Sequence, residues 1–185
     1  LVRGYMSVAE AFINLKEFDS LYSNAMKGLS LATEWKMSFA IAKFNEQLGI
    51  YFARSSKQYD SAIVHLDIAL KTFSEINTRY DVAVVLQNLG NVHLNLKDYG
   101  GAVKYANQGL ELARELKLDQ VMHLCLKDLV EAYEKLGNIS ESYRYLKEFV
   151  VVNDSLLVRN NRKVVGELEA RFQNQKKEAQ LIVQD

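Results

Sequence analysis

The side chains of this sequence that could do chemistry are few, and most lie apart from suitable neighbours. None of the three histidines has a histidine or cysteine partner at the spacing of a metal site. No serine stands in a G-x-S-x-G setting, and no glycine-rich loop could cradle a phosphate. Glu10, Glu46 and Glu131 are too far apart in sequence to argue a catalytic pair from spacing. We therefore expect no enzyme activity, no metal and no cofactor, with an unrecognised hydrolase as a remote alternative.

A row of amide side chains is the best candidate for molecular recognition. Gln87, Asn91 and Asn95 recur every four residues and would stand one above another on a helix. The opposite side of that helix carries Leu89 and Gly90, which are typical of packing positions. Because an amide offers both a donor and an acceptor, the row could pair with the backbone of an extended peptide. The alternative is that these residues only keep a solvated helix face polar.

Other polar residues fall on the equivalent face of neighbouring helices by helical spacing. Together with the amide row, they complete the predicted binding surface: Lys43, Arg54, Asn14, Lys127 and Glu131. Lys43 and Arg54 could hold a carboxylate or an acidic side chain of the bound segment. For each charge taken singly, a solvated helix face is the favoured interpretation.

The elements that would position these residues are pairs of helices, written four times at intervals of 40 or 41 residues. Small residues mark one slot of the first helix, at Ala9, Gly49 and Gly90, and Val130 occupies it in the fourth unit. Glycine inside a helix costs about 1 kcal/mol relative to alanine, so we expect another helix to pass close to it. With valine there, the fourth pair should be splayed or shifted. The one-residue difference in spacing places an insertion near Ser55-Ser56.

Residues 1 to 153 resemble the tetratricopeptide repeat, whose pattern is W-x2-L-G-x2-Y followed by A-x3-F and P. The third unit carries it best, as Leu86-x2-Leu89-Gly90-x2-His93 followed by Ala102-x3-Ala106. The resemblance implies an all-α fold, a right-handed α-solenoid whose first helices line a concave groove for a protein or peptide. The chain departs from the family by having no proline and a period above the usual value of about 34 residues, which predicts longer helices.

This frame divides the chain into a repeat array at residues 1–159 and a further helix at 160–185. The expected units are residues 1–36, 37–77, 78–118 and 119–159. The family's clamp for chaperone tails needs a lysine where the second and third units have Glu46 and Gln87, so we do not expect that ligand.

The composition excludes some partners and leaves the compartment open. With 23 basic and 23 acidic residues the net charge is zero, which gives no general attraction to nucleic acid. No stretch is long and apolar enough to span a bilayer. Cys125 is predicted to be a small buried hydrophobe. Because the sequence starts at Leu1 and ends within a helical pattern, we expect it to be a piece of a longer protein.

The last residues leave the repeat frame. The Asn160-Asn161 pair could cap a new helix. After it, apolar residues recur with the heptad spacing of a coiled-coil seam, which also contains the polar residue Gln175: Val165, Leu168, Phe172, Ala179 and Ile182. Either this helix caps the last repeat, or it leaves the array as a signalling or dimerising helix. Both hold if Val164 to Phe172 dock and the remainder projects. The seam predicts a weak homodimer.

A second resemblance concerns the segment Asn153–Glu178, which looks like the end of the repeat region in a group of bacterial sensors. In those proteins such a helix leads to a membrane span and a histidine-kinase or DNA-binding output domain. The function this implies is non-enzymatic binding of a protein or peptide, as the sensory or interaction region of a bacterial signal-transduction protein. The alternative is a purely structural spacer or dimerisation module without a ligand.

Overall fold

The structure is a computed structural model that describes the backbone of residues 1–182 and the side chains of residues 1–163. Every regular element in this part of the chain is helical. The helices are α1 (Val2–Leu15), α2 (Phe18–Glu34), α3 (Ser38–Tyr51), η1 (Phe52–Ser56), α4 (Tyr59–Glu75), α5 (Arg79–Asn95), α6 (Tyr99–Leu116), α7 (Asp119–Lys135) and α8 (Ile139–Ile182).

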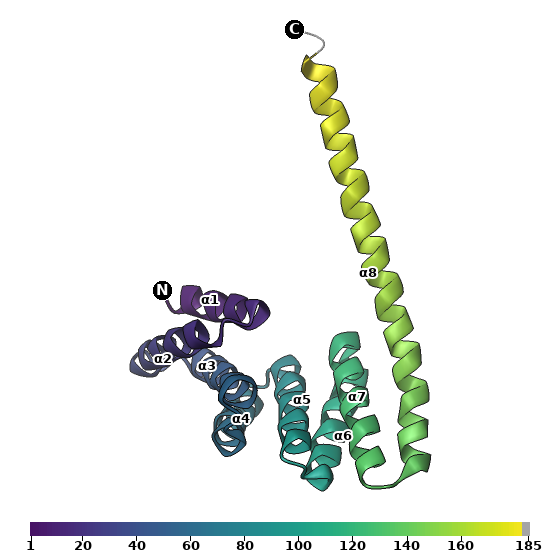
Figure 1. Cartoon of the computed structure of the whole chain (residues 1–185). Coiled ribbons are helices and arrows are strands. Elements are labelled where there is room, and N and C mark those ends of the chain that lie inside the picture. The colour runs from purple at the N-terminus through teal and green to yellow at the C-terminus, as the bar shows by residue number, and fades with distance from the viewer. Residues whose placement is uncertain (183–185) are drawn as a thin grey trace.

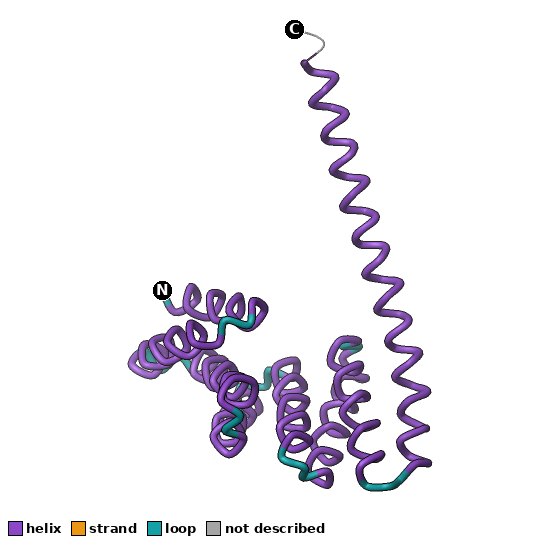
Figure 2. The backbone as a smooth tube through the Cα atoms, in the orientation of Figure 1, coloured by secondary structure: helices purple, strands orange, loops and turns teal. Residues whose placement is uncertain are grey.

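The helices form antiparallel pairs, α1 with α2 through α7 with the start of α8, stacked side by side in chain order (Figure 1). Only short turns join them, and the tube view shows the same zigzag path (Figure 2). The fold is therefore the all-α solenoid that the repeat spacing predicts. Buried side chains form a series of clusters between neighbouring pairs, which is how a solenoid distributes its core.

The glycine slots are close contacts between helices, as predicted. A Cβ atom on Gly90 would lie 3.2–3.4 Å from the backbone and Cβ of Ala106 on α6. One on Gly49 would lie 2.6 Å from Cγ of Leu66 on α4. Small residues are needed here because the paired helix leaves no room for a side chain.

The inserted residue of the second unit is accommodated in η1, one turn of π-helix at the end of α3. In the other units the first helix closes with a bond from an N–H to the carbonyl five residues earlier, as from Asp98 to His93 at 2.9 Å. Here Gln58 donates to Phe52, six residues earlier, also at 2.9 Å. The prediction of an insertion near Ser55-Ser56 is confirmed, since both residues lie in η1.

Each turn between helices is closed by a residue with positive φ. Glycine usually fills this position, but only Gly137 does so in the described residues. Five lysines and one asparagine hold the others: Lys16, Lys36, Lys57, Asn77, Lys97 and Lys117. A lysine there costs backbone strain, although its charge favours the carboxyl end of the preceding helix.

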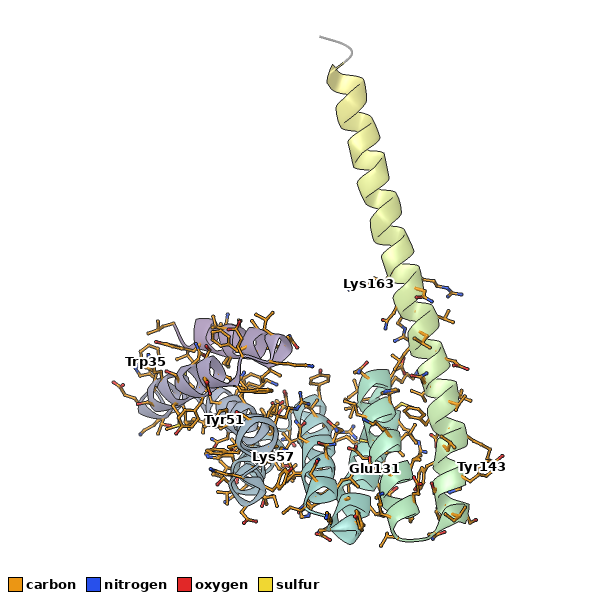
Figure 3. All side chains as sticks on the ribbon, in the orientation of Figure 1. Trp35, Tyr51, Lys57, Glu131, Tyr143 and Lys163 are labelled. Carbon is orange, nitrogen blue, oxygen red and sulfur yellow. The ribbon has the colours of Figure 1, made fainter. Side chains whose placement is uncertain are left out.

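The expectation of a new helix capped at Asn160-Asn161 is wrong. The second helix of the fourth pair and the terminal helix are one element, because α8 runs without a break from Ile139 to Ile182. Arg159 makes an ion pair of 2.6 Å with Asp119, the first residue of α7. Lys163 therefore lies beyond the array on the projecting part of α8 (Figure 3).

The predicted capping segment Val164 to Phe172 and the seam Val165, Leu168, Phe172, Ala179 and Ile182 carry side chains outside the described residues. Their docking and pairing stay predictions. In the part of the chain that was searched, no helix combines the length and apolarity that crossing a membrane requires.

Candidate partner-binding surface

The amide row lies on α5, but two of its three members are engaged within the protein. The side-chain amides of Gln87 and Asn91 each donate to the carboxylate of Asp128 on α7, both at 3.2 Å. Asn95 donates to the backbone oxygen of Asn91 at 2.7 Å. Gln87 is buried, Asn91 is half-buried and only Asn95 is exposed. The row therefore fastens the third pair to the fourth, and little of it faces solvent.

Asp128 accepts both of these hydrogen bonds, and its role at the joint was not predicted from the sequence. It is 3% exposed, and burial raises the pKa of its carboxyl to about 6, although the two amide hydrogen bonds act in the opposite direction. A signal existed in the sequence. Gln47, Asn88 and Asp128 stand two residues before the small slot in three units, so a polar residue recurs within an apolar face.

Lys43 takes part in a second joint of the same kind, between the second and third pairs. Its ammonium lies 2.7 Å from Glu46 and 3.6 Å from Asp81 on α5. Burial opposes the charge of Lys43, but Glu46 and Asp81 raise its pKa above the ordinary value. Burial also raises the pKa of Glu46, and Lys43 only partly offsets this. Lys43 thus neutralises carboxylates of the protein itself.

The remaining candidate residues are exposed and lie in different places. Arg54 is on η1 and shares with Asn91 a narrow cavity of about 10 Å³, which holds one water molecule at most. Asn14 lies near the end of α1. Lys127 and Glu131 lie together on α7. The structure therefore divides the predicted surface into two joints and separate exposed residues.

A cleft lies between α7 and α8. It has a volume of about 380 Å³, and its lining is Lys127, Val130, Glu131, Glu134, Lys135, Leu146 and Phe149. The third unit has Gly90, Ala106 and Gly109 where the fourth has Val130, Leu146 and Phe149. The fourth pair therefore carries larger apolar side chains at these three positions. Figure 3 labels Glu131 on α7, next to the first turns of α8.

The histidines contact aromatic rings. His93 stacks on Tyr105 with ring centroids 5.0 Å apart and lies 2.8 Å from Asp98. His65 stacks on Phe52 at 5.3 Å, and His123 contacts Phe149 at 4.7 Å. Among the described side chains, no group of three or more histidines, cysteines and acidic residues could hold a metal.

Cys125 is buried and makes no disulfide, as predicted. Burial raises the pKa of its thiol to about 12, with a further contribution from the charge of Asp128. The reactive form of cysteine is the thiolate. This thiol is therefore inert at neutral pH.

The fold and this surface define a class of protein, a helical repeat scaffold. Residues 40–115 match the profile of the tetratricopeptide repeat family. This match, together with the repeated helix pairs, supports a tetratricopeptide repeat protein. No curated protein matches the sequence significantly.

Among solved structures, the chain is similar to the crystal structure of BtubC (BKLC) from P. vanneervenii, with a TM-score of 0.73 and 17% identity. The similarity covers 84% of this chain and 64% of that one, so this chain spans less than two thirds of the related chain. At this identity the likeness shows the fold alone.

Proposed function

We propose that this chain is a non-enzymatic scaffold that binds a segment of a partner protein. The repeat family supports a role in protein interaction. The observation that carries the proposal is the cleft between α7 and α8, which combines apolar Val130, Leu146 and Phe149 with a charged rim. Apolar contact supplies affinity, and a few polar groups at the edge supply orientation.

Selection of peptides tests this function. A random peptide library displayed on phage is panned on the chain, and selected peptides are measured by fluorescence anisotropy. We expect to select peptides that bind the folded chain and that dissociate from it when the chain is thermally unfolded. A selection that yields only peptides equally bound by an unrelated helical domain would contradict the proposal.

We further propose that the scaffold is the sensory or interaction region of a bacterial signal-transduction protein. The resemblance of Asn153–Glu178 to bacterial sensors supports this, and so does the unbroken course of α8. A ligand that tilts the fourth pair would move the projecting end of the same helix. Sequencing the reading frame beyond Asp185 tests the proposal. A membrane span and an output domain are expected there, whereas an immediate stop codon would contradict it.

One observation favours the alternative of a dimerisation module. Val151 and Val158 are exposed on α8, and they stand two heptads and one heptad, respectively, before Val165 of the predicted seam. The side of α8 that packs on α7 carries Tyr145 and, half-buried, Phe149. At 100° per residue the two valines point well away from that packed side. A second copy could therefore reach this seam without displacing α7.

A further inference from the structure

One face of α8 is exposed where the corresponding face of α6 is covered. Ala106 and Leu110 of α6 are 0% and 1% exposed, in a cluster with Cys125 and other residues of α7. One repeat step of 40 residues relates Ala102 to Ser142, and the same step relates Ala106 to Leu146 and Leu110 to Val150. Leu146 is 40% exposed and Val150 is 48% exposed. The face that receives the following helix in the third pair is thus apolar and uncovered in the fourth.

The charged side chains Lys127 and Glu131 on this surface are exposed. Lys127 and Glu131 occupy the positions of Gln87 and Asn91, which in the third pair hold Asp128 of the following helix. Within the described residues, none of the four charged side chains that line the cleft makes a side-chain hydrogen bond or an ion pair, although Lys127 and Glu131 both interact electrostatically with the buried Asp128. They keep their hydration until a partner arrives, so each can meet an opposite charge there.

We propose that the α7/α8 surface binds an amphipathic helix of a partner protein, seated where the first helix of a further pair would lie. The proposal rests on the binding function above and names its ligand class. The surface continues the series in which α5 packs on the second pair and α7 packs on the third. Each preceding pair accepts side chains that are three or four residues apart on the next helix. A helical partner presents side chains at this spacing, whereas an extended peptide does not.

The packing of α7 shows what the partner helix should carry. Its buried side chains include Val121, Cys125, Leu129 and Ala132, at steps of four, four and three residues, and these pack in clusters with residues of the third pair. Because the fourth pair has Leu146 and Phe149 in place of Ala106 and Gly109, the partner must sit differently at that point. The cleft of about 380 Å³ has room for one large apolar side chain, such as leucine or phenylalanine. An acidic residue near Lys127 and a basic residue near Glu131 complete the match.

A helical probe tests the proposal. The 17-residue sequence of α7 serves as the peptide scaffold, with the positions of Val121, Cys125, Asp128, Leu129 and Ala132 randomised in a display library. The best peptide is labelled, and its dissociation constant is measured by anisotropy against the whole chain. We expect the selected peptides to gain helicity on binding and to favour a large apolar residue at one of the five positions.

Two matched variants locate the binding. Val150→Glu places a charge on the proposed surface, and Val64→Glu places one on α4, where the valine is 59% exposed. Because both valines are exposed, both variants should fold, which thermal melts verify. We expect Val150→Glu to weaken the peptide at least about tenfold, since an unpaired charge is then buried beneath it. Val64→Glu should change the constant less than about twofold.

Charge exchange gives an independent readout. The Lys127→Glu variant should weaken a peptide with an acidic residue at the facing position and strengthen one with a basic residue there. Equal binding of the helical peptide to the parent, Val150→Glu and Lys127→Glu proteins would overturn the proposal. So would selected peptides that lose binding in Asn95→Ala and not in Val150→Glu. In either case the protein would still bind a partner segment, but at another site. If the random peptide library of the preceding section also yields no specific peptide, the proposed binding function is wrong as well.

A second copy is the other possible occupant. Sedimentation at increasing concentration of the chain shows whether it associates with itself. If the mass rises and Val150→Glu prevents the rise, the surface belongs to a contact between copies and the partner-helix proposal is wrong. Mostly monomeric protein that binds the helical peptide one to one supports it.

Discussion

Asn91 donates a hydrogen bond of 3.2 Å to the carboxylate of Asp128, across the joint between the third and fourth helix pairs. Gln87 donates to the other oxygen of the same carboxylate. The joint therefore consists of a buried negative charge held by two neutral amides, with no cation bonded to it in the described residues. Such an arrangement makes the contact dependent on the protonation of Asp128.

We expect the joint to weaken as pH rises. The pKa of Asp128 is about 6 in the folded protein, whereas an unfolded aspartate titrates near 4. Between these values the folded state binds the proton more tightly, so the free energy of unfolding falls as pH increases from about 4 to about 6. Above the folded pKa the whole decrease in the free energy of unfolding is present, and it is of the order of 3 kcal/mol.

Asp128→Asn removes this titration, so it should flatten the pH dependence and raise stability at neutral pH relative to the parent. Denaturant unfolding of both proteins between pH 4 and pH 7 measures the difference. The other carboxylates are common to the two proteins and cancel in it. A difference that stays constant over this range would show that Asp128 titrates normally.

Removing all three amides should destabilise the array. On sequence alone, the triple variant of Gln87, Asn91 and Asn95 to alanine is expected to melt near the parent temperature. The structure changes this expectation, because the variant leaves the Asp128 carboxylate buried without donors, at a cost of about 1–3 kcal/mol. Adding Asp128→Ala to the triple variant should recover part of the loss. Asn95→Ala by itself should alter the melt by less than about 0.5 kcal/mol, since that residue is exposed.

Local patterns predicted most of the fold because they record steric constraints. Gly49 and Gly90 mark helix contacts through their lack of a Cβ, and the spacing of Gly49 from Tyr59 located η1. The pairing of Gln87 with Asp128 escaped prediction because it depends on the register between helices 41 residues apart in the chain. Side chains such as Gln87 and Asp128 are exposed when their helix is considered alone, but they are buried where the neighbouring helices pack together.

The end of the array was predicted wrongly for a different reason. A pair of asparagines is favoured at helix starts, yet each also tolerates a helix interior at a modest cost. No proline or glycine stands between Gly137 and Gly166, so nothing stops the helix at Asn160. Continuity of α8 was therefore the simpler expectation. The cleft beside it is lined by Leu146 and Phe149, whose size relative to Ala106 and Gly109 is visible in the sequence.

Gly90→Leu should destabilise the protein by about 3 kcal/mol through overpacking. The side chain would enter space already occupied by Ala106, whose backbone nitrogen is 3.2 Å from an ideal Cβ. This cost exceeds the gain of about 1 kcal/mol from replacing glycine in a helix. Thermal and urea melts give the value, with Asn95→Ala as the control on the same helix. Similar small shifts for both variants would contradict the close contact.

Replacing a turn lysine by glycine should stabilise the protein. Lys97 has φ of 63°, a conformation that costs a lysine about 1 kcal/mol and a glycine almost nothing. We expect Lys97→Gly to raise the free energy of unfolding by about 0.5–1 kcal/mol, partly offset by the greater freedom of the unfolded chain. Lys104→Gly, within α6, serves as the control and should lower it by about 1 kcal/mol. A loss of stability in both variants would mean that the Lys97 side chain contributes more than its strain costs.

The projecting end of α8 should carry any association between copies. We expect the chain to sediment as mostly monomer at micromolar concentration, because Gln175 and Ala179 weaken the predicted seam. Truncation before Gln175 should abolish the residual dimer and leave the thermal melt unchanged, since Arg159, which pairs with Asp119, holds α8 to the array well before that point. Val158→Glu should have the same effect on dimerisation in the full chain, as that valine is exposed and aligned with the seam. If truncation lowers the melting temperature, the end of α8 stabilises the array along its whole length, and the dimerising or signalling role of this helix is wrong.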